Sequence, residues 1–266
     1  MKAELKRGFT SPLFFLSMAV LFLCLQGYSL PSYCNQWFGE GIEPLELRQS
    51  ALSMTLGGIF FGGMLLLLPF CASMAYATIQ VDDLRSSLMK WSVLRSSIRC
   101  YAARKITVAF LCGAIAAGLA FSIHASLWHL LTLPYDPLMY PNHEIGFWQD
   151  SFFLEWSTIS NGLPMIIEIA FGLALTAGIW SVVALAVSIW VPDKLLVVII
   201  PASIFKLWSA NLSYYLFGFR LPSPDTLFND AQTVQGDLQC LVAYSVLLLL
   251  AITVYFIGLK RRACHA

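Results

Sequence analysis

The sequence predicts an all-α membrane protein with six transmembrane helices, and three observations lead to this prediction. Of the 266 residues, 58% are hydrophobic and only 12% are charged, whereas soluble domains are about 45–50% apolar and about 25% charged. Six apolar runs are each long enough to cross about 30 Å of hydrocarbon. The residue alternation that is typical of outer-membrane β-strands is absent from the sequence. We therefore expect a single transmembrane domain, residues 1–266, built from helices that satisfy their own backbone hydrogen bonds in lipid.

The six expected spans are separated by segments that contain most of the charged residues. Only two charged side chains interrupt the apolar runs, Glu168 in the fourth and Lys206 in the fifth. The spans are expected at about 12–30, 51–78, 106–133, 164–191, 195–218 and 238–259, and the outer loops at 31–50, 134–163 and 219–237. A long polar connection, 79–105, joins the second and third spans.

The distribution of Lys and Arg predicts which way the chain is inserted. An even number of spans places both termini on one side, and thirteen of the sixteen Lys and Arg residues lie on that side. The loops on the other side hold only Arg48 and Arg220, together with ten of the fifteen acidic residues. Because cytoplasmic loops are enriched in cations, we expect both termini in the cytoplasm of a multi-pass plasma-membrane protein. The net charge of +1 gives no reason to expect a nucleic-acid partner.

The basic N-terminus and the first apolar run resemble a signal peptide only in outline. The run is longer than the 7–15 apolar residues of a typical signal, and no small-residue cleavage site follows it, so we expect a retained span. Seven cysteines include no C-x-x-C spacing, which argues against zinc or redox chemistry. Cys34 and Cys240 alone lie near the outer face, either as a disulfide or as two small apolar residues. His124 and His129 do not have the spacing that stacks side chains on one helix face, so we expect no metal site.

Motifs of common enzyme active sites are absent from the sequence. It contains no G-x-x-x-x-G-K-[ST] phosphate loop, no H-E-x-x-H and no G-x-S-x-G. We therefore expect no catalytic residue and no cofactor bound by this chain.

The 79–105 connection carries the main functional signal. Asp82 or Asp83 is expected to cap the start of a helix, where a carboxylate complements the helix dipole. A largely apolar stripe follows at helical spacing, formed by Leu84, Leu88, Trp91 and Arg95 at i, i+4, i+7 and i+11. The cations Arg85 and Lys90 lie between these positions and point in other directions. Anionic headgroups would explain the cations alone. The apolar face with its tryptophan predicts either docking in a groove of a partner protein or a position at the membrane interface.

This arrangement resembles the permease subunits of ABC-2-type ABC transporters. The shared features are the basic start MKAELKRGF before the first span, a second span that ends near Pro69 and Tyr76, and the acidic pair that follows. The segment from Leu94 to Lys105, which leads into the third span, completes the motif. The resemblance covers the whole chain in span number, topology and length, but its residue-level motif is confined to the connection between the second and third spans.

The resemblance implies a working mechanism. It implies an N-terminal interfacial helix near residues 2–10 and a coupling helix near 82–94 that docks on a separate ABC ATP-binding subunit. The contact residues would be Asp82, Asp83, Arg85, Leu88, Lys90, Trp91 and Arg95, with a second, smaller contact at Pro192, Asp193 and Lys194. ATP and Mg²⁺ would bind to the partner, and two permease subunits, identical or related, would work with two ATPases, in the direction of export. The longest outer loop here is 134–163 rather than the loop between the last two spans, which leaves the substrate class open.

Several residues inside the expected spans are candidates for function or for packing. A charged group in hydrocarbon usually faces protein or water, so Glu168 and Lys206 are candidates for a translocation pathway. The alternatives are an interfacial carboxylate and a lysine that extends to the membrane surface. The spacings of Gly58 with Gly62 and of Ala114 with Gly118 predict close helix packing, either within the chain or at a dimer seam. Pro69 and Pro201 are expected to kink the second and fifth spans.

Two other functional classes fit the sequence. One is a stand-alone secondary carrier or channel with Glu168 and Lys206 at its polar centre, although no internal repeat is visible. The other is a membrane anchor or assembly protein that binds partners through its outer loops. Dependence on ATP separates the permease from both.

Overall fold

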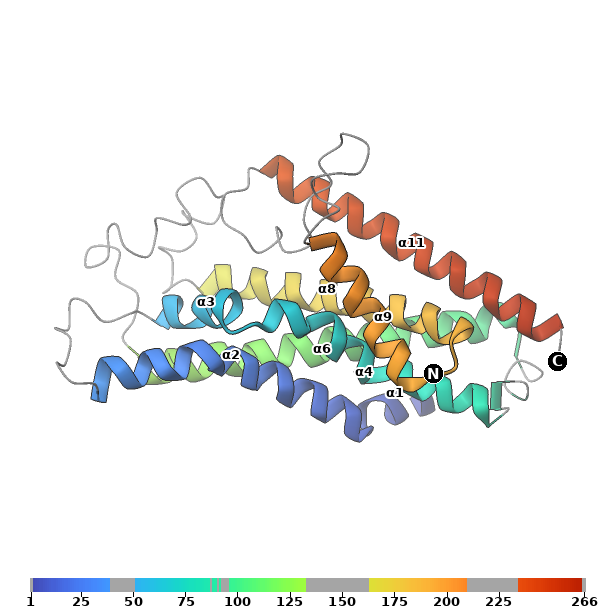
Figure 1. Ribbon diagram of the computed structural model, residues 1–266, viewed down its shortest axis with the longest axis horizontal. Coiled ribbons are helices and arrows are strands. Elements are labelled where there is room, and N and C mark those ends of the chain that lie inside the picture. Colours follow the sequence, from blue (N-terminus) through green and yellow to red (C-terminus); the bar gives the residue numbers. More distant parts are fainter. Residues whose placement is uncertain are drawn as a thin grey trace.

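The computed structural model describes residues 2–38, 51–86, 88–89, 91, 96–132, 163–209 and 234–264. In these residues the chain is helical apart from short turns between the helices and has no β-strand. The helices are α1 (Lys2–Phe9), α2 (Pro12–Phe38), α3 (Ala51–Phe61), α4 (Met64–Arg85), α6 (Ile98–Leu131), α8 (Leu163–Trp190), α9 (Lys194–Leu207) and α11 (Val234–Cys264). They form an elongated bundle in which α1 and the end of α11 lie at the same end (Figure 1).

Five of these helices, α2, α4, α6, α8 and α11, are long and apolar enough to cross a membrane. The prediction of an all-α, multi-pass membrane protein is therefore confirmed. Helix α9 has 14 residues and covers the first part of the expected fifth span, 195–218, whose last residues lie outside the described ones. Of the expected outer loops, most of 31–50 and 134–163 and nearly all of 219–237 also lie outside the described residues.

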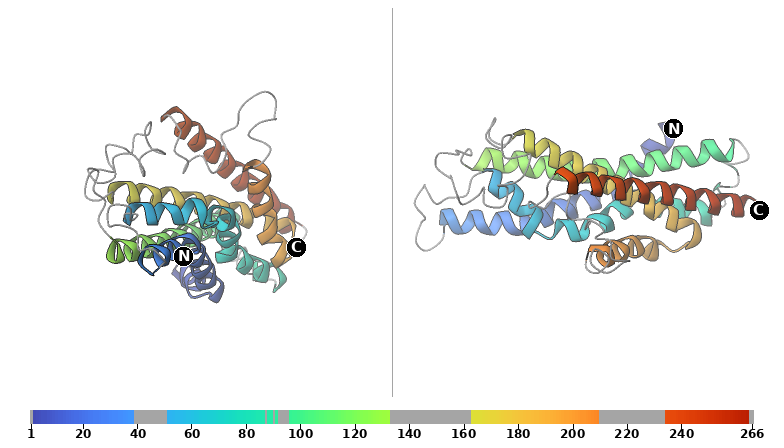
Figure 2. Two further views of the ribbon diagram at one scale, coloured as in Figure 1. Left: turned by 60° about the vertical axis from the view of Figure 1, so that its left-hand side comes forward. Right: turned by 90° about the horizontal axis from the view of Figure 1, so that it is seen from above.

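Helices α4 and α8 form the centre of the bundle. In each of them 72% of the most apolar stretch is buried, compared with 28% in α2 and 22% in α11. Helix α6 packs against both α2 and α8, α9 packs against α4, and α11 packs against α8. The further views in Figure 2 show α11 along one side of this arrangement. The peripheral helices therefore present apolar faces outward, as expected for contact with lipid.

Glycines allow the closest helix contacts. A Cβ atom on Gly62 would lie 2.3 Å from the backbone oxygen of Cys24, and one on Gly58 would lie 2.7 Å from that of Leu25, both in α2. A Cβ atom on Gly113 of α6 would similarly lie 2.6 Å from the backbone oxygen of Ala177 in α8. Of the two alternatives for the Gly58–Gly62 spacing, the structure shows packing within the chain.

The expected second span, 51–78, is divided into two helices. Helix α3 ends at Phe61 and α4 begins at Met64, and Gly63 between them has φ of 75°. This left-handed conformation costs a residue with a side chain about 1–2 kcal/mol. The interruption therefore lies at Gly63, before the kink that we expected at Pro69, which is inside α4.

Several helices continue beyond the apolar runs that predicted them. Helix α2 extends to Phe38, α4 to Arg85, and α6 begins at Ile98. These helices continue past the expected span ends at 30 and 78 and begin before the expected start at 106, because a charged residue marks the edge of an apolar run, whereas helical hydrogen bonding continues beyond it. Both α4 and α6 therefore extend into the expected connection 79–105.

Candidate functional site

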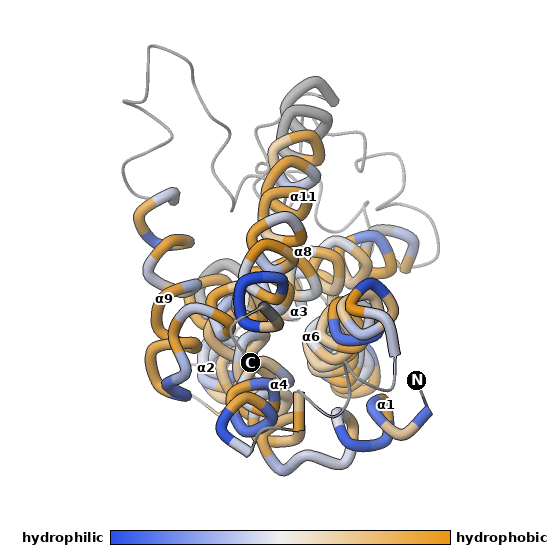
Figure 3. The backbone as a smooth tube through the Cα atoms, turned by 90° about the vertical axis from the view of Figure 1, so that its right-hand side faces the viewer, coloured by the Kyte–Doolittle hydropathy of each residue, from blue (hydrophilic) through white to orange (hydrophobic). Residues whose placement is uncertain are grey.

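Charged residues gather at the end of the bundle that holds α1. We call this the charged end, and it consists of α1, the last turns of α4 and α11, and the first turns of α6 and α9. Figure 3 is seen from this end and shows the hydrophilic segments of these helices around the apolar bundle. Two polar assemblies lie here, one built around a buried ion pair and one exposed.

Side-chain caps fix where the helices begin at this end. The side chain of Ser97 accepts a hydrogen bond from the backbone N–H of Cys100, which caps α6. The carboxylate of Asp193 accepts hydrogen bonds from the backbone N–H groups of Leu195 and Leu196 at 2.9 and 3.1 Å, which caps α9. Both caps satisfy backbone donors that have no partner inside the helix.

Asp82 and Asp83 lie in the last turn of α4. Our prediction that one of them caps the start of a coupling helix was therefore wrong, because the second span continues through both. Successive residues on a helix point about 100° apart. Asp82 consequently faces the surface, with 48% of its side chain exposed, whereas Asp83 faces the bundle interior with 4% exposed.

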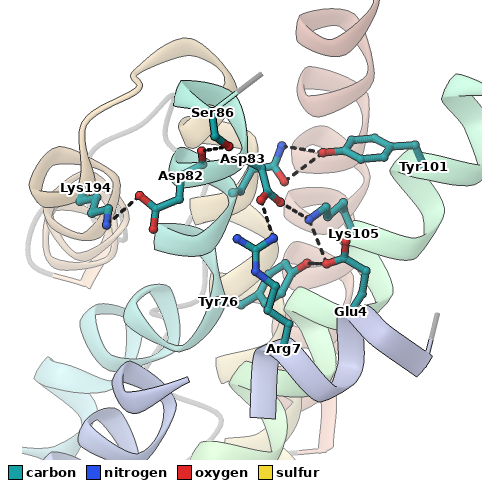
Figure 4. Close-up of polar contacts among 10 residues, drawn as sticks. Glu4, Arg7, Tyr76, Asp82, Asp83, Ser86, Tyr101, Lys105 and Lys194 are labelled. Atoms are coloured by element: carbon teal, nitrogen blue, oxygen red, sulfur yellow. Dashed lines mark hydrogen bonds and ion pairs between the residues drawn. The ribbon is translucent and has the colours of Figure 1, made fainter. Parts of the chain in front are cut away.

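Asp83 belongs to a group of four charges, which we call the four-charge cluster: Glu4 and Arg7 of α1, Asp83 of α4 and Lys105 of α6 (Figure 4). Asp83 and Lys105 are buried, whereas the side chains of Glu4 and Arg7 are 28% and 42% exposed. Lys105 Nζ lies 2.5 Å from Asp83 Oδ2 and 3.0 Å from Glu4 Oε2. Arg7 Nη1 lies 2.5 Å from Asp83 Oδ1. Two carboxylates and two cations sum to zero, so the cluster joins three helices without burying net charge.

Aromatic and amide side chains enclose the buried lysine. The ammonium group of Lys105 lies 5.5 Å from the ring centre of Tyr76 and 5.7 Å from that of Tyr101, within the range of cation–π attraction. Tyr76 donates a hydrogen bond of 2.9 Å from its hydroxyl to Glu4 Oε2. Gln80 pairs with the hydroxyl of Tyr101. The charged groups therefore have polar or aromatic partners on several sides, as buried charges require.

The electrostatic surroundings favour the charged forms of the two α1 residues. Burial opposes ionisation of Glu4, but the attraction of Lys105 and the hydrogen bonds from Lys105 and Tyr76 outweigh it, so the pKa of Glu4 lies below its ordinary value. Burial likewise opposes the charge on Arg7, but its hydrogen bond to Asp83 and the attraction of that carboxylate raise the pKa of Arg7. Both residues therefore carry their charges at neutral pH.

The exposed assembly joins the end of α4 to the turn between α8 and α9. Arg85 donates two hydrogen bonds, of 3.2 and 2.8 Å, to the backbone oxygen of Pro192 and lies 3.8 Å from the carboxylate of Asp193. Lys194 Nζ lies 2.8 Å from Asp82 Oδ1. We call these five residues the turn junction. The two segments that the family resemblance assigned to separate contacts thus form one surface.

The rest of the expected coupling helix is described only in part. Leu88, Met89 and Trp91 are helical. Leu88 and Trp91 are 48% and 63% exposed, whereas Met89 is buried. Lys90 and Arg95 lie outside the described residues, so the structure does not test their place on this surface.

The candidates within the membrane do not form a common site with the charged end. Glu168 is exposed near the start of α8, about 33 Å along the helix from Trp190, and Lys206 is exposed about 18 Å along α9 from Lys194. The ion pairs found among the described residues do not join these two side chains. Among the described residues, no group of three or more His, Cys, Asp or Glu side chains is placed to hold a metal ion.

The other candidates from the sequence have ordinary surroundings. Cys34 has a free thiol, and the side chain of Cys240 lies outside the described residues. His124 is buried between Gln26 and the backbone oxygen of Thr55, with ring nitrogens 3.2 and 3.3 Å from these partners. These contacts explain His124 as a residue that joins α2, α3 and α6.

Sequence reasoning did not predict the four-charge cluster. Asp83 was expected to contact a partner, Arg7 and Lys105 were counted among the cytoplasmic cations, and no role was predicted for Glu4. One signal was available, since Glu4 and Arg7 are one helical turn apart in a short helix, where opposite charges share a face. Their partners on α4 and α6 could not be identified from this spacing.

We compared the chain with known proteins. No family model matches it. A search of curated proteins and a search of solved structures also give no match. The functional argument therefore rests on the residues themselves.

Proposed function

We propose that this chain is the transmembrane permease subunit of an ATP-driven ABC transporter of the ABC-2 type, with export as its direction. In this proposal the chain crosses the plasma membrane six times with both termini in the cytoplasm, and α1 lies at the membrane interface. A separate ABC subunit binds ATP and Mg²⁺, and a second permease chain completes the transporter. Glu168 and Lys206 remain candidates for the translocation pathway.

The turn junction carries this proposal. Asp82 and Arg85 at the end of α4 bind the turn that contains Pro192, Asp193 and Lys194, and the exposed Leu88 and Trp91 follow in the chain. Such a surface, with an apolar anchor beside salt bridges, is suited to a protein partner. It also lies at the end with both termini and most of the cations, which is the cytoplasmic end if the positive-inside rule applies.

The contacts suggest how movement would pass from the partner to the bundle. A displacement at Leu88 and Trp91 would act on the end of α4, one of the two most buried of the five candidate spanning helices. The turn junction connects the end of α4 to the turn between α8 and α9. The ion pairs of Asp83 connect the same end to α1 and α6. Helix α4 is uninterrupted from Met64 to Arg85, so it could move as one rod about the break at Gly63. Rigid-body movement of packed helices of this kind is a known form of coupling.

The double substitution Leu88→Asp and Trp91→Asp tests the proposal. Both side chains are exposed, so the variant should fold, and we expect it to lose the ATP-binding subunit on purification and to lose the stimulation of ATP hydrolysis. The matched control is Ala3→Asp with Ala103→Asp, which adds the same charge at exposed positions of α1 and α6. Retention of the partner by the L88D/W91D variant would contradict the assigned contact.

A further inference from the structure

Two lysines on α1 have no partner in the described part of the chain. Lys2 and Lys6 are exposed, and their side chains make no hydrogen bond or ion pair there. The carboxylates that could neutralise them are already engaged, because Glu4 binds Lys105 and Tyr76, and Asp83 binds Arg7 and Lys105. The described part of the chain therefore provides no counterion for either lysine, and both ammonium groups are open to a ligand from outside.

The same face of α1 leads to an apolar surface. Lys2, Lys6 and Phe9 are at i, i+4 and i+7 and so share one side of the helix. The ring of Phe9 packs edge-on against Phe14 with centroids 5.3 Å apart, and Phe14 packs against Phe15 at 5.5 Å. Phe15 is 52% exposed at the start of α2. Three contacting rings thus run from the lysine side of α1 to the outward face of α2, with the buried Phe14 between Phe9 and Phe15.

The outward face of α2 continues as an apolar stripe along the helix. Leu16, Leu23 and Leu30 are about half exposed or more, and α2 is long and apolar enough to cross a membrane. A molecule that fits this surface has a negative head at Lys2 and Lys6 and a hydrocarbon chain along Phe15 and the leucines. That combination is characteristic of an anionic phospholipid, since cations near a membrane surface attract anionic headgroups.

We propose that the α1–α2 corner binds one anionic phospholipid, with its phosphate at Lys2 and Lys6 and an acyl chain against Phe15 and Leu16. The four-charge cluster holds α1 against α4 and α6 through Glu4 and Arg7, so the helix that carries the two lysines is fixed to the bundle. This inference concerns the lipid surroundings of the chain and holds whether or not an ATP-binding subunit is the partner.

The test measures lipid binding to the purified full chain by native mass spectrometry. Phosphatidylglycerol is the anionic probe, and phosphatidylcholine and inorganic phosphate are the comparison probes. We expect phosphatidylglycerol to bind in preference to both. The variant Lys2→Gln with Lys6→Gln should bind it about thirtyfold more weakly, since each cation near the surface contributes roughly a fivefold effect.

The control variant is Arg99→Gln with Arg104→Gln, because these exposed arginines of α6 also have no partner in the described chain. It removes the same charge from the same end, and we expect it to retain most of the binding. Equal losses in the two variants would show a diffuse attraction to the whole charged end and overturn the assigned corner. Competition by inorganic phosphate would overturn the lipid assignment. Unchanged lipid binding together with loss of a copurifying protein from the K2Q/K6Q variant would assign the surface to a protein partner.

Discussion

Asp82 and Asp83 are adjacent in the chain but make contacts of very different strength. Asp82 pairs with Lys194 at the surface, where water screens the charges and such a pair contributes about 0–1 kcal/mol. Asp83 pairs with Lys105 in the interior, where loss of one partner leaves an uncompensated buried charge and costs about 3–5 kcal/mol. Neighbouring carboxylates therefore have different effects, the outer one forming a weak surface pair and the inner one holding helices together.

This difference predicts the effect of removing each lysine. We expect Lys105→Met to lower the free energy of unfolding by about 3–5 kcal/mol and Lys194→Met by less than about 1 kcal/mol. Unfolding of the purified chain in mixed micelles measures both. In addition, the losses from Asp83→Asn and Lys105→Met should not add in the double variant, with a coupling of about 0.5–3 kcal/mol. Additive losses would show that the two groups do not interact.

Glu4 predicts a dependence of stability on pH. Because the pKa of Glu4 in the folded chain lies below its ordinary value, its ionised form stabilises the fold at and above the ordinary carboxyl range. This contribution is lost as the pH falls through the lowered pKa. We expect the wild type to have a higher thermal midpoint than Glu4→Gln at pH 7, and the difference to shrink below about pH 4. A difference that is constant down to pH 3 would contradict the prediction.

At the scale of the elements, α4 connects the break in the second span, the buried centre of the bundle and the charged end. Its first residue follows the break at Gly63, its middle is buried, and its last turn carries both Asp82 and Asp83. Helix α3, on the other side of the break, is held against α2 by the close approach at Gly58 and Gly62. The two halves of the second span thus have different neighbours, and the glycines allow both arrangements.

Alanine substitutions at the glycines test this packing. We expect Gly62→Ala to destabilise the fold by about 1–3 kcal/mol, because its Cβ would overlap the backbone oxygens of Cys24 and Gly58. Gly118→Ala is the control, since its Cβ would lie 3.5 Å from the Cβ of Ala174 in ordinary contact. We expect it to be neutral or to stabilise α6 by up to about 1 kcal/mol. Equal effects of the two variants on the midpoint of unfolding would show that the close approach is unimportant.

The sequence predicts the helices of this chain better than their ends or contacts. Helix α8, Leu163–Trp190, agrees with the expected 164–191, because the apolar run and the helix both stop near Pro192. The ends of α4 and α6 could not be predicted from the same criterion, since these helices continue through charged residues. The four-charge cluster could not be predicted either. Its partners are 22, 76 and 101 positions apart in the chain, and only the packing of α1, α4 and α6 brings them together.

At the scale of the whole molecule, the bundle has one charged end and a long apolar body. The charged end combines a partly buried cluster that fixes α1, α4 and α6 with an exposed junction that ties α4 to the turn before α9. The outward faces of α2 and α11 are apolar. Our proposal assigns the charged end to a cytoplasmic ATPase and these apolar faces to lipid or to a second permease chain, and this assignment is its central claim.

The most direct test of that claim is to purify the tagged full chain from its own host in mild detergent and to identify bound proteins by mass spectrometry, together with an ATPase assay. We predict a stoichiometric partner with a phosphate-binding loop and vanadate-sensitive ATP hydrolysis, both lost in the L88D/W91D variant. A chain that is isolated alone and inert toward ATP, although candidate ATP-binding subunits are abundant in the same membranes, would contradict the claim and favour a stand-alone carrier.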